Sequence, residues 1–262
     1  MKRVFQFYLI SFIFSWGVWI LGMVFLADRM HPTLLVSIGG IGPLVGLVYY
    51  LMCKDTPSVK AFFKHRFFPH HRLGWTMIWL AIFLPILVLI DTYLWDWIFQ
   101  TRFLIAFDEN FLSTWLISSV FIFFFGPLPE EMAWRGLAFH DLSKESIIKA
   151  QVIVMVLWAL WHVPLFFIRG TYQAELGIMS LSGLLFFVNI LSLSILTGWL
   201  YVLSQSIFVV TLFHYMVNLL GEVLVPTKEQ TIIRAVIYGV LAVISVIVYL
   251  TNQRKESLIK DQ

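Results

Sequence analysis

The stretch Val4–Leu26, VFQFYLISFIFSWGVWILGMVFL, decides the fold class of this chain. It carries no charged residue, and about 20 mostly apolar residues are enough for a helix to cross a bilayer. The apolar core of a cleaved signal peptide is shorter, at about 7–15 residues. We therefore expect a retained transmembrane helix after Met1-Lys2-Arg3.

The composition extends this conclusion to the whole chain. Of its 262 residues, 60% are hydrophobic and only 13% are charged, whereas soluble domains carry about a quarter charged residues. The net charge of +3 is small and the basic residues lie in loops, which gives no indication of nucleic-acid binding. The single cysteine, Cys53, excludes an internal disulfide and a thiolate metal cluster.

Eight segments are candidates for membrane spans. They are 4–26, 33–53, 75–98, 111–140, 147–168, 177–203, 206–224 and 232–250. The fourth contains Pro127 and Pro129, so we expect a kinked helix or two helical pieces there. The predicted fold class is all-α: a polytopic transmembrane helix bundle of about eight spans, in which residues 1–262 form a single integral membrane domain.

The distribution of Lys and Arg predicts the orientation of the bundle. The segments on the side of both termini hold Lys2, Arg3, Lys54, Lys60, Lys64, Arg66, Arg72, Lys144, Lys149, Arg254, Lys255 and Lys260. The segments on the other side hold Arg29, Arg102, Arg169, Lys228 and Arg234. Because cytoplasmic loops are enriched in Lys and Arg, we expect both termini in the cytoplasm.

Three polar clusters lie inside the apolar stretches. They are Glu130-Glu131-x-x-x-Arg135, Trp158-x-x-x-His162 and His214-x-x-x-Asn218. Ionisable residues are costly within a membrane, so each is a candidate functional site. Each also has a structural interpretation: an ion pair that closes a helix end, a hydrogen-bonded interior histidine, or a polar seam between helices.

Taken together, the clusters supply the groups that amide hydrolysis needs. A carboxylate and a neutral histidine can hold and deprotonate water, and a second histidine with an asparagine amide can stabilise an oxyanion. Glu131 and Arg135 are four residues apart on a helix and can pair, which leaves Glu130 for another role. This reading requires that the helix continue through Arg135.

At these residues the chain resembles the CPBP intramembrane proteases, also called the Abi or CAAX protease and bacteriocin-processing family, which includes the type II CAAX prenyl endopeptidases. The family pattern is Glu-Glu-x-x-x-Arg, then Phe-x-x-x-His, then His-x-x-x-Asn. Trp158 stands where the family usually has Phe, a change that we expect to leave the chemistry untouched. The motif-bearing core covers about 111–224.

The resemblance implies a membrane-embedded protease with a water-filled cavity that opens towards the cytoplasm. It implies that Glu130 and His162 activate water, that His214 and Asn218 stabilise the oxyanion, and that Glu131 and Arg135 position the site. The family is often labelled metalloprotease; His-Glu-x-x-His is absent from this sequence, and we favour activation of water without a metal. If Zn²⁺ were used, Glu130, His162 and His214 could be its three ligands.

The depth of the three clusters tests whether they can meet. At about 1.5 Å per residue, Glu130 lies about 15 Å from residue 140 and His214 about 12 Å from residue 206, but His162 lies about 22 Å from residue 147. We therefore expect a site a third to halfway across the bilayer, with His162 the member that fits least well.

The expected partners are a membrane-associated peptide or protein substrate and the lipid bilayer, with no nucleic acid. The expected location is the cell membrane. In a bacterium, precursors of peptide pheromones or bacteriocins would be better candidate substrates than prenylated proteins, by family analogy alone. Two alternatives stay open: a transporter that uses the buried polar cluster, and a non-catalytic scaffold or immunity protein.

Overall fold

The computed structural model describes residues 2–26, 29–53, 56–99, 111–223 and 228–260, and their regular structure consists of helices. The helices are α1 (Lys2–Phe25), α2 (Pro32–Gly40), α3 (Gly42–Met52), α4 (Val59–Arg66), α5 (Arg72–Phe99), α6 (Phe111–Phe125), α7 (Pro127–Ala133), the π-helix η1 (Trp134–Phe139), α8 (His140–Ser143), α9 (Ile147–Trp161), the 3₁₀-helix η2 (Val163–Phe167), α10 (Tyr172–Leu176), α11 (Leu181–Ser204), α12 (Ile207–Val223) and α13 (Lys228–Lys260). The expected all-α class is thus confirmed.

Within the described residues, seven helical segments are long and apolar enough to cross a membrane. They are Lys2–Phe25, Pro32–Met52, Arg72–Ile90, Leu116–Ser143, Ile147–Phe167, Leu181–Ser204 and Thr231–Thr251. The eighth candidate, 206–224, is also a helix, but its apolar part is the shorter segment Ile207–Gly221. Seven of the eight predicted segments are therefore helices that are long and apolar enough to cross a membrane.

The fourth span consists of successive helical pieces, as its prolines predict. α6 ends at Phe125, and Gly126 separates it from α7, which has Pro127 in its first turn. A proline fits there because the first backbone N–H groups of a helix have no acceptor within it. The helix then continues through Arg135 as the π-helix η1, the continuation that the functional interpretation requires.

The short helix α12 begins inside the protein rather than at its surface. Ile207 is fully buried. The backbone N–H of Phe208 and the hydroxyl of Ser206 both donate to the carbonyl of Phe67, just after α4. Seventeen residues are enough for α12 because its first turn is covered by the segment that follows α4.

Small residues allow α1 to pack closely against α3. A Cβ atom at Gly42 would collide with the side chain of Ser15, and one at Gly46 would collide with that of Ser11. Close contact between small residues is a common way for helices to associate in membranes. Large apolar side chains such as Phe5 and Ile13 are exposed on the opposite side of α1, as expected for a surface that faces lipid.

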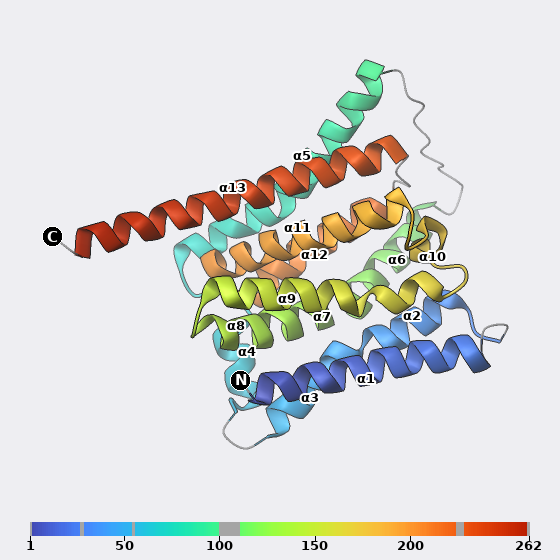
Figure 1. Ribbon diagram of the computed structural model, residues 1–262, viewed down its shortest axis with the longest axis horizontal. Helices are drawn as coiled ribbons and strands as arrows, with labels where there is room; N and C mark the ends of the chain where they lie inside the picture. Colours follow the sequence, from blue (N-terminus) through green and yellow to red (C-terminus); the bar gives the residue numbers. More distant parts are fainter. Residues whose placement is uncertain (1, 27–28, 54–55, 100–110, 224–227, 261–262) are drawn as a thin grey trace.

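The two termini lie at the same end of the bundle, together with α4 and α8 (Figure 1). We call this the terminal end. The opposite end carries α10 and the start of α2 (Figure 1). The basic side chains described at the terminal end are Lys2, Arg3, Lys60, Lys64, Arg66, Arg72, Lys144 and Lys149. Of the residues counted for orientation, the side chains of Lys54, Arg102, Lys228, Arg254, Lys255 and Lys260 lie outside the described part.

Candidate active site

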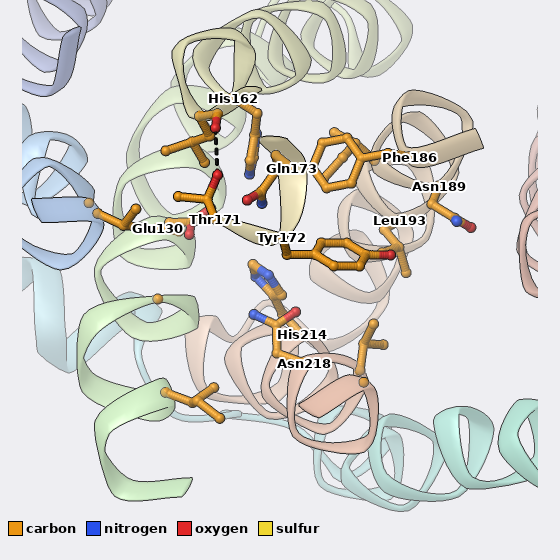
Figure 2. Close-up of a pocket in the computed structure, with 18 of the residues that line it drawn as sticks. Glu130, His162, Thr171, Tyr172, Gln173, Phe186, Asn189, Leu193, His214 and Asn218 are labelled. Atoms are coloured by element: carbon orange, nitrogen blue, oxygen red, sulfur yellow. Dashed lines mark hydrogen bonds between the residues drawn. The ribbon is translucent and has the colours of Figure 1, made fainter. Parts of the chain in front are cut away.

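Four of the predicted site residues line one cavity of about 610 Å³. Glu130 comes from α7, His162 from the end of α9, and His214 and Asn218 from α12 (Figure 2). Each of the first three is less than a tenth exposed. The structure therefore brings together residues that lie up to 88 positions apart in the sequence (218 minus 130).

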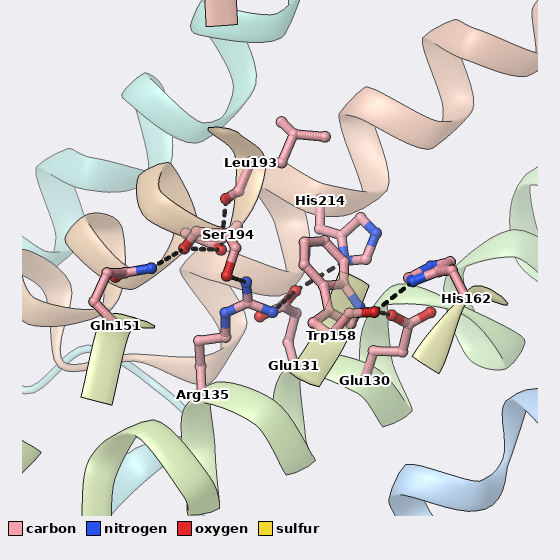
Figure 3. Close-up of polar contacts among 10 residues, drawn as sticks. Glu130, Glu131, Arg135, Gln151, Trp158, His162, Leu193, Ser194 and His214 are labelled. Carbon is pink, nitrogen blue, oxygen red and sulfur yellow. Dashed lines mark hydrogen bonds and ion pairs between the residues drawn. The ribbon is translucent and has the colours of Figure 1, made fainter. Parts of the chain in front are cut away.

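Glu130 is held by a hydrogen bond that the sequence motif did not reveal. The indole Nε1–H of Trp158 donates to Oε2 of Glu130 over 2.7 Å (Figure 3). Phenylalanine has no group that could make this bond. The residue that departs from the family pattern therefore contacts the candidate base directly. The expectation that it leaves the chemistry untouched stays a prediction.

The tautomer of His162 follows from its partner. Its Nδ1 lies 2.7 Å from the carbonyl oxygen of Trp158 (Figure 3). A carbonyl oxygen can only accept, so Nδ1 must carry the proton. In the neutral ring, Nε2 then holds a lone pair that can accept a proton from water.

Glu131 points away from the cavity into a fully buried ion pair. Its Oε1 accepts from the Nη1–H of Arg135 over 3.1 Å, and the same oxygen lies 2.8 Å from Nδ1 of His214 (Figure 3). Neither Glu131 nor Arg135 has any exposed surface. The prediction that these two residues pair is confirmed, and through Glu131 the pair contacts a cavity-lining histidine.

Arg135 also connects this pair to neighbouring helices. Its Nη2–H donates to Oγ of Ser194 on α11 over 3.1 Å, and its guanidinium lies 4.5 Å from the centre of a Trp158 ring. The backbone carbonyl of Ser194 in turn accepts from Gln151 of α9 (Figure 3). The sequence motifs contain neither Ser194 nor Gln151, because a single polar residue in an apolar helix gives no distinctive signal.

His214 has a defined proton as well. The ionised carboxylate of Glu131, paired with Arg135, accepts from Nδ1–H of His214. Neutral His214 would therefore present the lone pair of Nε2 to the cavity, and it could donate there only as an imidazolium. The amide of Asn218 lines the same part of the cavity and can donate in its neutral form (Figure 2).

The residues do not form a ready zinc centre. Among the described residues, no three His, Cys, Asp or Glu side chains are grouped closely enough to hold a metal ion. The conditional ligand set of Glu130, His162 and His214 is thus not assembled as three ligands around one point, which a tetrahedral zinc site needs.

The apparent mismatch in depth at His162 arose from the assumed end of the fourth span. Helical structure continues to Ser143 rather than stopping at residue 140. Counted from Ser143, Glu130 lies about 20 Å along the helix, close to the value of about 22 Å for His162. The shorter distance of His214 from the start of its helix has a separate cause. It is counted from a helix end that lies inside the protein, because α12 starts at the buried residue Ile207.

The fold and the site define a class: a multi-pass α-helical membrane protein with a buried carboxylate and two histidines around a cavity. Comparison with known proteins is more specific. Residues 110–220 match the family model described as "Type II CAAX prenyl endopeptidase Rce1-like". This range contains all three motifs and agrees closely with the predicted core of 111–224.

A curated relative agrees with the family match. The chain is 34% identical over 145 residues to "CAAX prenyl protease 2" of Methanococcus maripaludis. The match covers 54% of this chain and 52% of the relative, so it spans about half the length of each. Over this part, the chain is similar to the Rce1-like type II CAAX prenyl endopeptidase family, which agrees with the resemblance carried by its motifs.

Proposed function

We propose that this protein is an intramembrane endopeptidase that hydrolyses a peptide bond in a membrane-associated peptide or protein. One observation carries the proposal: a carboxylate and a histidine from two helices both bond to Trp158 at the wall of one cavity. The match of residues 110–220 to the family model independently supports a membrane protease.

Glu130 is the proposed general base. In the described part of the chain, Trp158 provides the hydrogen bond to Oε2, and the carboxylate lines the cavity where water can reach it. The water proton passes to Glu130 or to Nε2 of His162 as the water oxygen attacks the carbonyl carbon. The same proton then goes to the departing amine as the C–N bond breaks, which balances the reaction.

Asn218 and His214 are the proposed oxyanion stabilisers. When the carbonyl oxygen becomes negative, the Asn218 amide can donate a hydrogen bond to it. His214 can donate through Nε2 when its ring is an imidazolium, with Nδ1 held 2.8 Å from Oε1 of Glu131. Glu131 and Arg135 act through position, because they hold His214 and the π-helix η1 in place.

The proposal treats residues 1–262 as one integral membrane unit with both termini in the cytoplasm, in the cell membrane. The support for this orientation is the excess of basic residues in the segments at the terminal end.

The test is cleavage by protein reconstituted in liposomes. The probe is a set of lipid-anchored peptides that carry a fluorescence donor and a quencher. Wild type should cleave at least one of them, whereas Glu130→Ala and His162→Ala should not. Equal cleavage by all three proteins would contradict the proposal, and cleavage of none would favour a non-catalytic scaffold. The surface variant Lys149→Ala is purified and reconstituted in the same way and controls for activity lost in those steps.

A further inference from the structure

A strongly basic segment lies outside the proposed active site. Residues 56–72 lead from the second span to the first residue of the third, and they contain four Lys or Arg residues but no Asp or Glu. The basic residues are Lys60, Lys64, Arg66 and Arg72. Because the segment joins two spans, it lies at a face of the membrane, at the terminal end of the bundle (Figure 1).

The inner face of α4 is attached to the rest of the protein. Phe62 is fully buried, and the Nη1–H of Arg66 donates to the carbonyl of Gly136 over 2.7 Å. Arg66 also lies 3.8 Å from a carboxylate oxygen of Asp141, so its charge is paired within the protein. These contacts give the outer face of α4 a fixed orientation relative to η1.

The outer face of α4 presents an apolar row beside a basic row. Val59 and Phe63 are four residues apart on the helix and form the apolar row. Lys60 and Lys64 form the basic row in the same way. All four side chains are exposed. A helix with an apolar face beside a cationic face is suited to the interface between lipid and water.

The start of α5 has the same combination of side chains. Arg72, Leu73 and Trp75 are all exposed, and tryptophan is enriched where a helix enters the interface of a membrane. Within the described part of the chain, no ion pair involves Lys60, Lys64 or Arg72. Carboxylates of the described residues therefore leave these three cations available for an anionic partner.

We propose that the outer face of α4, together with the start of α5, binds the headgroups of anionic phospholipids. The lysines meet the phosphate groups, and the apolar row of Val59 and Phe63 contacts the acyl chains, which a soluble anion lacks. The terminal end is also the end that the basic residues predict to face the cytoplasm, where the leaflet carries anionic lipids. This surface is separate from the residues that line the cavity, so its test needs no assay of cleavage.

The test uses the full chain in neutral detergent micelles. Dioleoylphosphatidylglycerol is added in increasing fractions, with dioleoylphosphatidylcholine as the uncharged reference. A lipid that binds the folded state raises the unfolding temperature, and the lipid fraction at half the rise gives an apparent affinity. The anionic lipid should stabilise wild type more than the reference does. Equal stabilisation by the two lipids would overturn the proposal.

The double variant Lys60→Gln/Lys64→Gln removes the basic row. It should need about tenfold more anionic lipid for the same rise, because two cations near the headgroups are lost. Without added lipid it should unfold as wild type does, since both side chains are exposed. Should it unfold early, Arg72→Gln and Phe63→Ser are tested singly, and wild-type affinity in both would overturn the proposal.

Two controls separate a lipid site from general attraction between charges. Lys149→Gln removes an exposed lysine that pairs with Glu145 at the same end of the bundle, and it should respond to the lipid as wild type does. A loss as large as that of Lys64→Gln would overturn the proposal. Inorganic phosphate at matched ionic strength should not stabilise wild type; stabilisation equal to that by the lipid would indicate a site for free phosphate instead.

Discussion

Glu130 and Glu131 are neighbours in the sequence but belong to two different parts of the molecule. Glu131 lies in a supporting cluster with Arg135 and Ser194, fully buried and closed by ion pairs and hydrogen bonds. Glu130 lies in a cavity-facing set with His162, His214 and Asn218. Two adjacent residues on a helix point about 100° apart, so one carboxylate can stabilise the fold while the other meets substrate.

The first prediction separates the two carboxylates by activity. Glu130→Gln should lower the cleavage rate by about 10²–10⁴-fold, because the amide cannot accept the water proton. Its stability should change little, since the amide oxygen can still accept from Trp158. The measurement is turnover in liposomes alongside thermal unfolding in detergent. If Glu130→Gln unfolded at a clearly lower temperature than wild type, Glu130 would have to be counted among the residues that stabilise the fold.

The second prediction concerns the supporting cluster. Arg135→Ala should destabilise the protein by about 3–5 kcal/mol, because it removes the arginine cation that neutralises the buried Glu131 carboxylate. The loss is measured as the shift in unfolding free energy. Arg135→Lys should recover only part of it, because lysine cannot bond to Glu131 and Ser194 with the same planar geometry. Wild-type stability in Arg135→Ala would show that the pair is dispensable.

The third prediction tests Trp158, which connects the two parts. Trp158→Phe restores the residue that the family pattern usually has and removes the bond to Glu130. A hydrogen bond to a charged group is worth about 1.5–3 kcal/mol, so we expect activity to change by about 10–100-fold and the pH profile to move. The ring still packs against Arg135 and His162. An unchanged pH profile would mean that the bond has no role in the protonation of Glu130.

The smallest effect is expected at the surface. Lys149 pairs with Glu145 over 3.0 Å, with both side chains about half exposed. Lys149→Ala should cost less than about 1 kcal/mol and leave cleavage unchanged, because water screens exposed pairs. Comparison of its unfolding free energy with that of Arg135→Ala measures how much burial adds to an ion pair of the same i,i+4 spacing.

Much of the fold and of the candidate site could be predicted from the sequence. Hydrophobic runs predicted the helical class and the approximate spans, because a helix must present about 20 apolar residues to cross lipid. The prolines at 127 and 129 predicted the break in the fourth span. Three polar clusters at helical spacing contained the side chains Glu130, His162, His214 and Asn218 that line the cavity, because such residues are rarely tolerated in membranes without a role.

The tertiary structure alone decided how those residues are used. It assigned Glu131 to the supporting cluster, gave Glu130 its indole donor, and fixed the proton on Nδ1 of His162. It also set the buried start of α12. The physical reason is that these properties depend on contacts between distant segments. Spacing along a helix specifies which face a residue occupies, whereas the partner on that face comes from another helix.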